Sequence, residues 1–356
     1  MSNDNLSLEQ KYKQVTDTIR AYPRQLKQSW DEIMGLYIPE DYNKVKQVVF
    51  CGMGGSALGA RIVDSLVFSR LRVPFEIFND YHLPAYVNDE TLVIVSSYSG
   101  GTEETLESLH EALSRGSKVF GITTGGRLGE ILHKRKIPSY IFNPINNPSG
   151  QPRMSIGYAV GSTLAILTKL GAIHFTTSEI DEADLAMTKA LTEFHENSPE
   201  TTNLAKLFAK KLKNKLPILV ASEHLIGACH TLKNQFNESA KTFSVLFELP
   251  ELNHHLMEGL ARPAKMKSEM HFIFISSNLY SEEVKKRYPI TSGVVEKNGI
   301  ENSTFSPRSS TKLAQIFEFL ALGSSVVYFL TKDYGIDPLI IPWVDYFKKE
   351  LAKGNK

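Results

Sequence analysis

The sequence predicts an α/β protein of two domains, each a parallel sheet flanked by helices. Its 356 residues are enough for two domains that each bury a core. Short apolar segments alternate with amphipathic segments of helical spacing, which is typical of parallel strands joined by right-handed helical crossovers. The second half loosely repeats the order of the first, as one duplicated α/β unit would.

The first half begins with helices and continues as strands and helices in turn. Residues 6–36 have helical spacing, and Pro23 separates two short helices. A mostly buried helix is expected over 155–171. Strands are expected in "KQVVFCG", "PFEIFND", "ETLVIVSS" and "KVFGITTGG", and helices in "ALGARIVDSLVFSRL" and "TEETLESLHEALSRG".

The second half has the same order of strands and helices but lacks the glycine-rich and hydroxyl-rich turns of the first half. "LPILVASEHLIGACHTLKNQFNESA" is strand, turn and helix, and "MHFIFISSN" is similar to "ETLVIVSSYSG". The glycines and the hydroxyl-rich loop are missing, so a phosphate site is expected in the first unit only. We expect N-terminal helices over 1–40, a first domain over 41–175, a linker helix over 176–203, and a second domain with C-terminal helices over 204–356.

The composition is that of a globular protein with a small-molecule partner. Hydrophobic residues make up 42% and charged residues 22% of the chain, and 40 basic against 39 acidic residues leave a net charge of +1. No overall field therefore attracts nucleic acid. The two cysteines do not form a disulfide framework, which fits a reducing compartment. The polar start "MSNDNLSLEQ" and the lack of a membrane-length apolar run predict a cytoplasmic location.

The stretch "CGMGGSALGARI" predicts a phosphate-binding turn between a strand and a helix. Gly52, Gly54 and Ala57 match the spacing of a dinucleotide-binding turn, and Glu76 or Asp80 is placed to hold a ribose. A tight turn needed only for packing the helix on the sheet is the other alternative.

The next loop, "SSYSGGTEET", favours the phosphate of a small metabolite. Ser97, Ser99 and Thr102 supply hydroxyl donors, and two glycines let backbone N–H groups converge at the start of a helix. A helix N-terminus carries about half a positive charge, which suits a dianion. Thr102 as a simple helix cap, followed by two glutamates, is the alternative. Three hydroxyls beside a second glycine turn fit that alternative poorly.

These two motifs together resemble the sugar-isomerase (SIS) domain family, which binds phosphosugars. "QPRMSIGYAVG", "NESAK" and "PELNHH" narrow the resemblance to the bifunctional phosphoglucose/phosphomannose isomerases, which have two SIS domains. It extends from about residue 40 to the C-terminus. It implies interconversion of glucose 6-phosphate and mannose 6-phosphate with fructose 6-phosphate in carbohydrate metabolism (glycolysis and gluconeogenesis), with no cofactor and as a homodimer. The phosphosugar-binding residues that it implies are Gly54, Gly55, Ser56, Ser97, Ser99 and Thr102.

Aldose–ketose isomerisation moves a proton between C1 and C2 through a cis-enediol. It needs a carboxylate base, a cation near the enediolate oxygen, and groups that open the sugar ring. Glu238 on its own is an ordinary helical glutamate, but the resemblance makes it the base. Arg153 is either a partner in a surface salt bridge or, by the resemblance, the fixed cation.

The resemblance assigns ring opening to His254 and Lys348. Adjacent histidines at 254 and 255 also suggest a metal ligand, but no second cluster lies at ligand spacing, so no metal is expected. His255 and Leu256 depart from the asparagine and glutamate usual in the family. Lys348 fits better than Lys349, although the residues before it also depart from the family pattern.

Two functions of other classes remain open at this point. A non-catalytic phosphosugar sensor would keep the hydroxyl loop and dispense with Glu238 and His254, and it would need a helix-turn-helix domain. A nicotinamide-dependent dehydrogenase would use the turn from Gly52 to Ala57.

Overall fold

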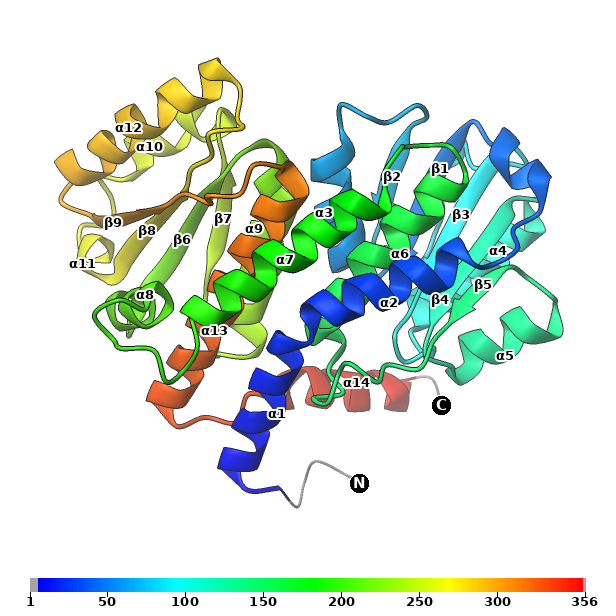
Figure 1. Cartoon of the computed structure of the whole chain (residues 1–356), viewed down its shortest axis with the longest axis horizontal. Helices are drawn as coiled ribbons and strands as arrows, with labels where there is room; N and C mark the ends of the chain where they lie inside the picture. The colour runs from blue at the N-terminus through cyan, green and yellow to red at the C-terminus, as the bar shows by residue number, and fades with distance from the viewer. Residues whose placement is uncertain (1–5, 355–356) are drawn as a thin grey trace.

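The computed structural model describes residues 6–354 as two α/β domains that lie side by side, with helices between them (Figure 1). Residues 1–5 and 355–356, the outer ends of the predicted domain ranges, lie outside the described residues. The elements of the first half are α1 (Leu8–Arg20), α2 (Tyr22–Met34), β1 (Gln47–Gly52), α3 (Leu58–Val67), β2 (Phe75–Phe78), β3 (Thr91–Ser96), α4 (Glu103–Ser114), β4 (Lys118–Thr123), α5 (Gly126–Lys134), β5 (Ser139–Ile141), α6 (Ile156–Lys169) and α7 (Thr177–Glu193).

The second half is built from a second set of alternating elements. They are α8 (Leu204–Leu212), β6 (Leu216–Ala221), α9 (Ile226–Glu238), β7 (Val245–Glu248), α10 (Leu256–Gly259), α11 (Met266–Glu269), β8 (Met270–Ile275), α12 (Glu282–Lys297), β9 (Glu301–Phe305), α13 (Lys312–Tyr334) and α14 (Pro342–Gly354). The predicted strands and helices of both halves are confirmed, except that the helix expected over 176–203 ends at Glu193. The strands β5, β7 and β9 and the helices α5, α8, α10, α11 and α12 were not predicted as elements.

The first sheet is fully parallel, with the strand order β2-β1-β3-β4-β5. Every residue of β3 and all but the first of β1 are buried, as expected for central strands covered on both faces. Gly52 pairs with Ser96 at the carboxyl ends of β1 and β3. The chain leaves β1 in one direction and β3 in the other, so these ends form the switch point at which open α/β sheets bind ligands. The glycine turn and the hydroxyl loop both start there.

The second sheet repeats this arrangement with the order β7-β6-β8-β9, again fully parallel. β6 and β8 therefore correspond to β1 and β3, which confirms the predicted repeat. The turn after β6 also keeps the backbone shape of the turn after β1: Gly54 has φ +51° and Glu223, at the corresponding position, has φ +45°.

Helix α3 joins the two domains because it packs on α6 of the first and on α9 of the second. A Cβ atom on Gly227 of α9 would lie 2.2 Å from the carbonyl oxygen of Arg61 in α3, so only glycine permits this close approach. One continuous hydrophobic core includes residues of α3, α6, α9 and α13. The two domains are therefore packed as one unit, and a site between them has a fixed geometry.

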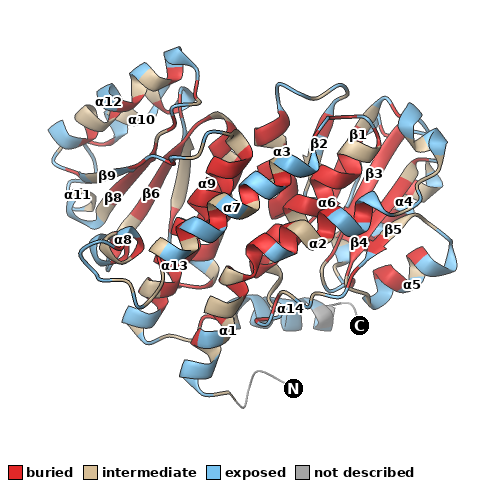
Figure 2. Cartoon of the chain, viewed as in Figure 1, coloured by how far each residue is buried: buried red, intermediate tan, exposed pale blue. Residues whose placement is uncertain are grey.

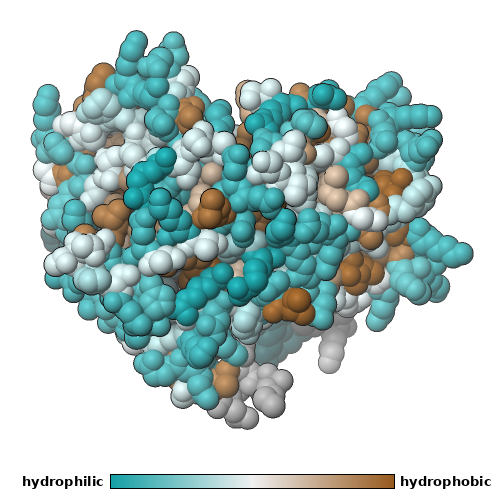
Figure 3. Space-filling view, in the orientation of Figure 1, coloured by the Kyte–Doolittle hydropathy of each residue, from teal (hydrophilic) through white to brown (hydrophobic). Residues whose placement is uncertain are grey.

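Helix α13 is long and apolar enough to cross a membrane, but 94% of its most apolar window is buried inside the protein. Figure 2 shows it among the buried helices at the centre of the molecule. It is a core helix. The face in Figure 3 is mainly polar, with hydrophobic residues in small separate groups. Cys51 and Cys229 are both free and buried.

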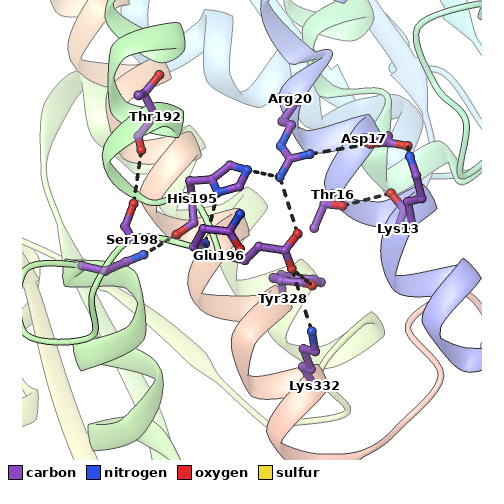
Figure 4. A network of polar contacts seen from close by, with 12 residues as sticks. Lys13, Thr16, Asp17, Arg20, Thr192, His195, Glu196, Ser198, Tyr328 and Lys332 are labelled. Atoms are coloured by element: carbon purple, nitrogen blue, oxygen red, sulfur yellow. Dashed lines mark hydrogen bonds and ion pairs between the residues drawn. The ribbon is translucent and has the colours of Figure 1, made fainter.

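A polar network ties the N-terminal helices to the second domain (Figure 4). Arg20, at the end of α1, lies 2.6 Å from Nε2 of His195 and 3.7 Å from a carboxylate oxygen of Glu196. Glu196 in turn accepts a hydrogen bond of 3.0 Å from the Tyr328 hydroxyl of α13. Because α2 also packs on α6, the N-terminal helices contact both domains.

Candidate active site

A cleft of about 580 Å³ lies at the carboxyl ends of β1 and β3, between the loops of the first domain and α14. It brings together most of the residues that the sequence singled out. They are Gly54, Gly55, Ser56, Ser99, Thr102, Arg153, Glu238 and Lys348. Ser97 and His254 do not line this cleft.

The glycine turn packs directly against the segment that carries Arg153. A Cβ atom on Gly55 would lie 2.7 Å from the backbone nitrogen of Arg153 and from the carbonyl carbon of Pro152, so a side chain there would separate the two. Ser56 closes the turn from the other side, because its Oγ accepts a hydrogen bond of 2.9 Å from the backbone N–H of Tyr98. The turn therefore holds the hydroxyl loop and the arginine segment together.

Ser97 is buried beneath the hydroxyl loop and contacts two of its residues. Its Oγ lies 2.8 Å from Oγ1 of Thr102 and accepts a hydrogen bond of 3.1 Å from the N–H of Gly100. Thr102 occupies the N-cap position of α4, but its side chain makes no capping hydrogen bond. The capping alternative for Thr102 is therefore not the observed arrangement. The hydroxyls of Ser99 and Thr102 lie at the cleft, next to the N-terminus of α4.

Arg153 is buried and held by several hydrogen bonds. Its Nε donates to Ser239 Oγ (3.1 Å) and its Nη1 to Gln151 Oε1 (2.8 Å). Its Nη2 donates to the carbonyls of Pro338 (2.7 Å) and Leu339 (3.2 Å). Burial lowers the pKa of the guanidinium, and nearby negative charge, chiefly that of Glu238, raises it. The result is a rigid cation at the wall of the cleft.

Glu238 is the last residue of α9, and its side chain is 29% exposed toward the cleft. Its Oε2 lies 3.8 Å from Nη1 of Arg153. Burial raises the pKa of the carboxyl above its ordinary value, while the charges of Arg153, Lys241 and Lys348 act in the opposite direction. A half-buried carboxylate with a raised pKa beside a fixed cation is suited to accept a proton.

Lys348 reaches the cleft from α14. Val344, Phe347, Lys348 and Leu351 all line it, and their i, i+3, i+4, i+7 spacing places them on one face of that helix. The neighbouring Lys349 does not line the cleft. α14 therefore contributes both a cation and an apolar wall.

His254 lies elsewhere. It ends a short 3₁₀ turn (Glu251–His254) after β7 and is exposed to solvent. The ring of the adjacent His255 is 6.2 Å from the ring of Phe247. Within one chain, the structure does not bring His254 to Glu238.

The sequence also raised a metal ligand and a dinucleotide-binding turn as alternatives. Within residues 6–354, no group of three or more His, Cys, Asp or Glu side chains is placed to hold a metal ion. The strand order 2-1-3-4-5 differs from the 3-2-1-4-5-6 order of the dinucleotide-binding fold. Glu76, a candidate ribose ligand, instead accepts a hydrogen bond of 2.8 Å from the Tyr86 hydroxyl.

The sequence did not predict the residues that hold Arg153 in place or the apolar side chains of α14 that line the cleft. Nothing in the sequence pattern indicates that Gln151 and Ser239 hold Arg153, because these contacts are made by tertiary packing. The apolar face of α14 did have a signal, since "WVDYFKKEL" places Val344, Phe347 and Leu351 at helical spacing.

Comparisons with known proteins show the family of the chain. Residues 41–127 match the model of the SIS domain, and residues 201–351 match that of the bacterial phospho-glucose isomerase C-terminal SIS domain. The chain is 31% identical over 344 residues to a bifunctional phosphoglucose/phosphomannose isomerase of Caldicellulosiruptor bescii, covering 95% of this chain and 98% of that one. A protein of the same description from Thermoplasma acidophilum is 30% identical and covers 86% of this chain and 89% of its own.

Among solved structures, a hypothetical protein of Thermus thermophilus has the same fold, with a TM-score of 0.73 at 15% identity. The match covers 97% of this chain and 94% of that one. The fold, the family models and the extent of the sequence similarity agree: the chain belongs to the bifunctional phosphoglucose/phosphomannose isomerase family.

Proposed function

We propose that the chain interconverts glucose 6-phosphate, and also mannose 6-phosphate, with fructose 6-phosphate. The observation that supports this most is that a phosphate-type loop, a buried arginine and a half-buried glutamate meet in one cleft. A phosphosugar sensor would need only the loop.

In this proposal the phosphate binds at the N-terminus of α4. The hydroxyls of Ser56, Ser99 and Thr102 and the N–H groups of the two glycine turns donate to its oxygens. Ser97 supports Thr102 and Gly100 from beneath. The phosphate anchors one end of the sugar and leaves C1 and C2 free to extend toward Glu238 in the second domain.

Glu238 acts as the base. It takes the proton from C2 of the open-chain aldose, the C2–H electron pair forms the C1–C2 double bond, and the C1 carbonyl electrons move to O1 to give the cis-enediolate. O1 then gains a proton and the O2 hydroxyl loses one, and as the C2 carbonyl forms the same carboxyl returns its proton to C1 to give the ketose. Negative charge develops on the enediolate oxygen during this transfer. The fixed guanidinium of Arg153 stabilises that charge without having to reorganise. Lys348 assists the opening of the ring.

His254 completes the ring-opening machinery from a second protomer. We infer a homodimer, as the resemblance implies, because His254 is exposed and lies outside the cleft of its own chain. The two free, buried thiols are consistent with a cytoplasmic enzyme.

The test is an assay that starts from fructose 6-phosphate and measures glucose 6-phosphate and mannose 6-phosphate separately. Formation of both aldoses is expected. Thermal stabilisation by fructose 6-phosphate without any aldose product would identify a sensor instead. Stabilisation by NAD or NADP alone would identify a dehydrogenase.

A further inference from the structure

Lys241 has a backbone conformation that lysine rarely adopts. Its φ is +52°, in the left-handed region that glycine occupies with less strain. It follows α9, whose last residue is Glu238. Glycine would relieve the backbone strain at this position, but only lysine supplies an ammonium group there.

That ammonium group joins two separate parts of the site. Nζ of Lys241 donates to the backbone carbonyl of Glu238 at 2.5 Å and to that of Ile340 at 2.6 Å. The first is one of the last carbonyls of a helix, which have no partner within the helix itself. The second lies in the connection between α13 and α14. Lys241 therefore connects the end of α9 to the start of α14.

Arg153 holds the same connection from its other side, through the carbonyls of Pro338 and Leu339. Two cations thus bind three consecutive carbonyls just before α14. Beyond this point α14 has few attachments. In the described part of the chain, its side-chain ion pair is the internal one between Lys353 and Glu350, and no hydrogen bond joins its side chains to another element. The position of α14 therefore depends on this connection and on apolar contacts.

We propose that Lys241 is a positioning residue for the isomerisation. By binding the carbonyls of Glu238 and Ile340 together, it fixes the base on α9 relative to Lys348 on α14. The inference rests on the proposed function. Lys241 does not line the cleft, so its loss is expected to reduce turnover and leave phosphosugar binding nearly intact.

The test uses Lys241→Gly with Lys136→Gly as its matched control. Lys136 has φ +54° and is exposed, and it does not line the cleft, so both substitutions relax the same backbone strain. Lys241→Gly is expected to lower kcat about tenfold, as loss of a charge-assisted hydrogen bond does, with KM and Tm nearly unchanged. Lys136→Gly leaves kcat unchanged. Lys241→Arg keeps two N–H donors and is expected to restore most of the turnover.

Hydrogen exchange of residues 338–351 gives a second readout that does not depend on turnover. Exchange there is expected to be faster in Lys241→Gly and unchanged in Lys136→Gly. If the wild type is active and Lys241→Gly leaves either kcat or the hydrogen exchange of residues 338–351 unchanged, Lys241 is not a positioning residue. A kcat loss that accompanies a lower Tm and is not rescued by arginine also overturns it. A wild type that produces no aldose overturns the proposed function itself, and this role with it.

Discussion

Nη1 of Arg153 lies 3.8 Å from Oε2 of Glu238, although the two residues belong to different domains. Arg153 precedes α6 of the first domain, and Glu238 ends α9 of the second. Because α3 packs on both of these helices, the distance between the cation and the carboxylate is set by the core that joins the domains. The proposed proton transfer therefore takes place where the two repeats pack together.

The proposed phosphate site predicts a specific effect of Thr102→Val. This change keeps the shape of the side chain and removes its hydroxyl, so KM for fructose 6-phosphate should rise about tenfold or more, because a hydrogen bond to a charged group contributes roughly 1.5–3 kcal/mol. Steady-state kinetics measure it. Thr102→Ser retains the hydroxyl and should stay close to wild type. An unchanged KM in both Thr102→Val and Ser97→Ala would show that the phosphate does not bind at this loop.

The homodimer proposal predicts complementation between two impaired variants. When Glu238→Gln and His254→Ala chains are mixed and allowed to exchange, about half of the dimers are hybrids, each with one site of wild-type residues. Activity should recover to about a quarter of the wild-type value at random exchange. If His254 acted within its own chain, no hybrid site would be complete. A mixture no more active than its two components would then exclude the shared site.

The face of α14 predicts different effects for two neighbouring lysines. Lys348 lines the cleft and Lys349 does not. Lys348→Met should lower kcat on the cyclic substrate about 10²-fold or more, as loss of a positioned acid–base group does. Lys349→Met is the matched control and should leave kcat unchanged. Equal effects of the two substitutions would mean that neither lysine has a specific role in ring opening.

The Lys241 ammonium predicts a change of kcat at alkaline pH. Desolvation and the charge of Arg153 lower the pKa of Lys241 to about 8, while Asp337 and Glu238 raise it. Deprotonation removes the charge from its two hydrogen bonds, so kcat should decrease as the pH rises through about 8. Lys241→Arg does not titrate in this range and should lose this decrease. A pH–kcat profile of the arginine variant that matches wild type would contradict the assignment.

Stability should change in the opposite direction over the same range. Between pH 8 and the ordinary lysine pKa of 10.5 the unfolded chain binds more protons at this residue than the folded one does. This group therefore makes the folded state more stable as the pH rises. Thermal melts at each pH separate the two effects. If kcat decreased because the protein unfolded, Tm would fall as the pH rises, whereas titration of Lys241 is expected to raise Tm.

The sequence predicted the parts of the fold that repeat simple patterns. The apolar runs of β1 and β3 and the helical spacing of α4 are local signals, and each was read correctly. β5 was not recognised, since a strand of three residues carries too little periodicity. The hydroxyl loop was also recognised from a local signal, because several serine and threonine residues lie between a predicted strand and a predicted helix.

The supporting contacts could not be predicted in the same way. Lys241 reaches Ile340 across a sequence separation of 99 residues, and no local pattern encodes such a pairing. Its φ of +52° is likewise invisible in a stretch with no glycine. The exposed position of His254, outside the cleft of its own chain, follows from how β7 and the turn after it are placed in the second domain. Contacts of this kind arise only from the assembled fold.

Glu238 is the residue proposed to carry the proton between C1 and C2. Glu238→Gln keeps the shape of the side chain but does not accept a proton, and the most direct measurement is deuterium exchange from solvent at C1 and C2, with cyclic substrate and with an open-chain analogue. Exchange and turnover should fall by about 10²–10⁴ with both substrates, while His254→Ala should slow only the cyclic one. Exchange at the wild-type rate in Glu238→Gln would contradict the account. Exchange abolished in His254→Ala even with the open-chain analogue would make the histidine the base.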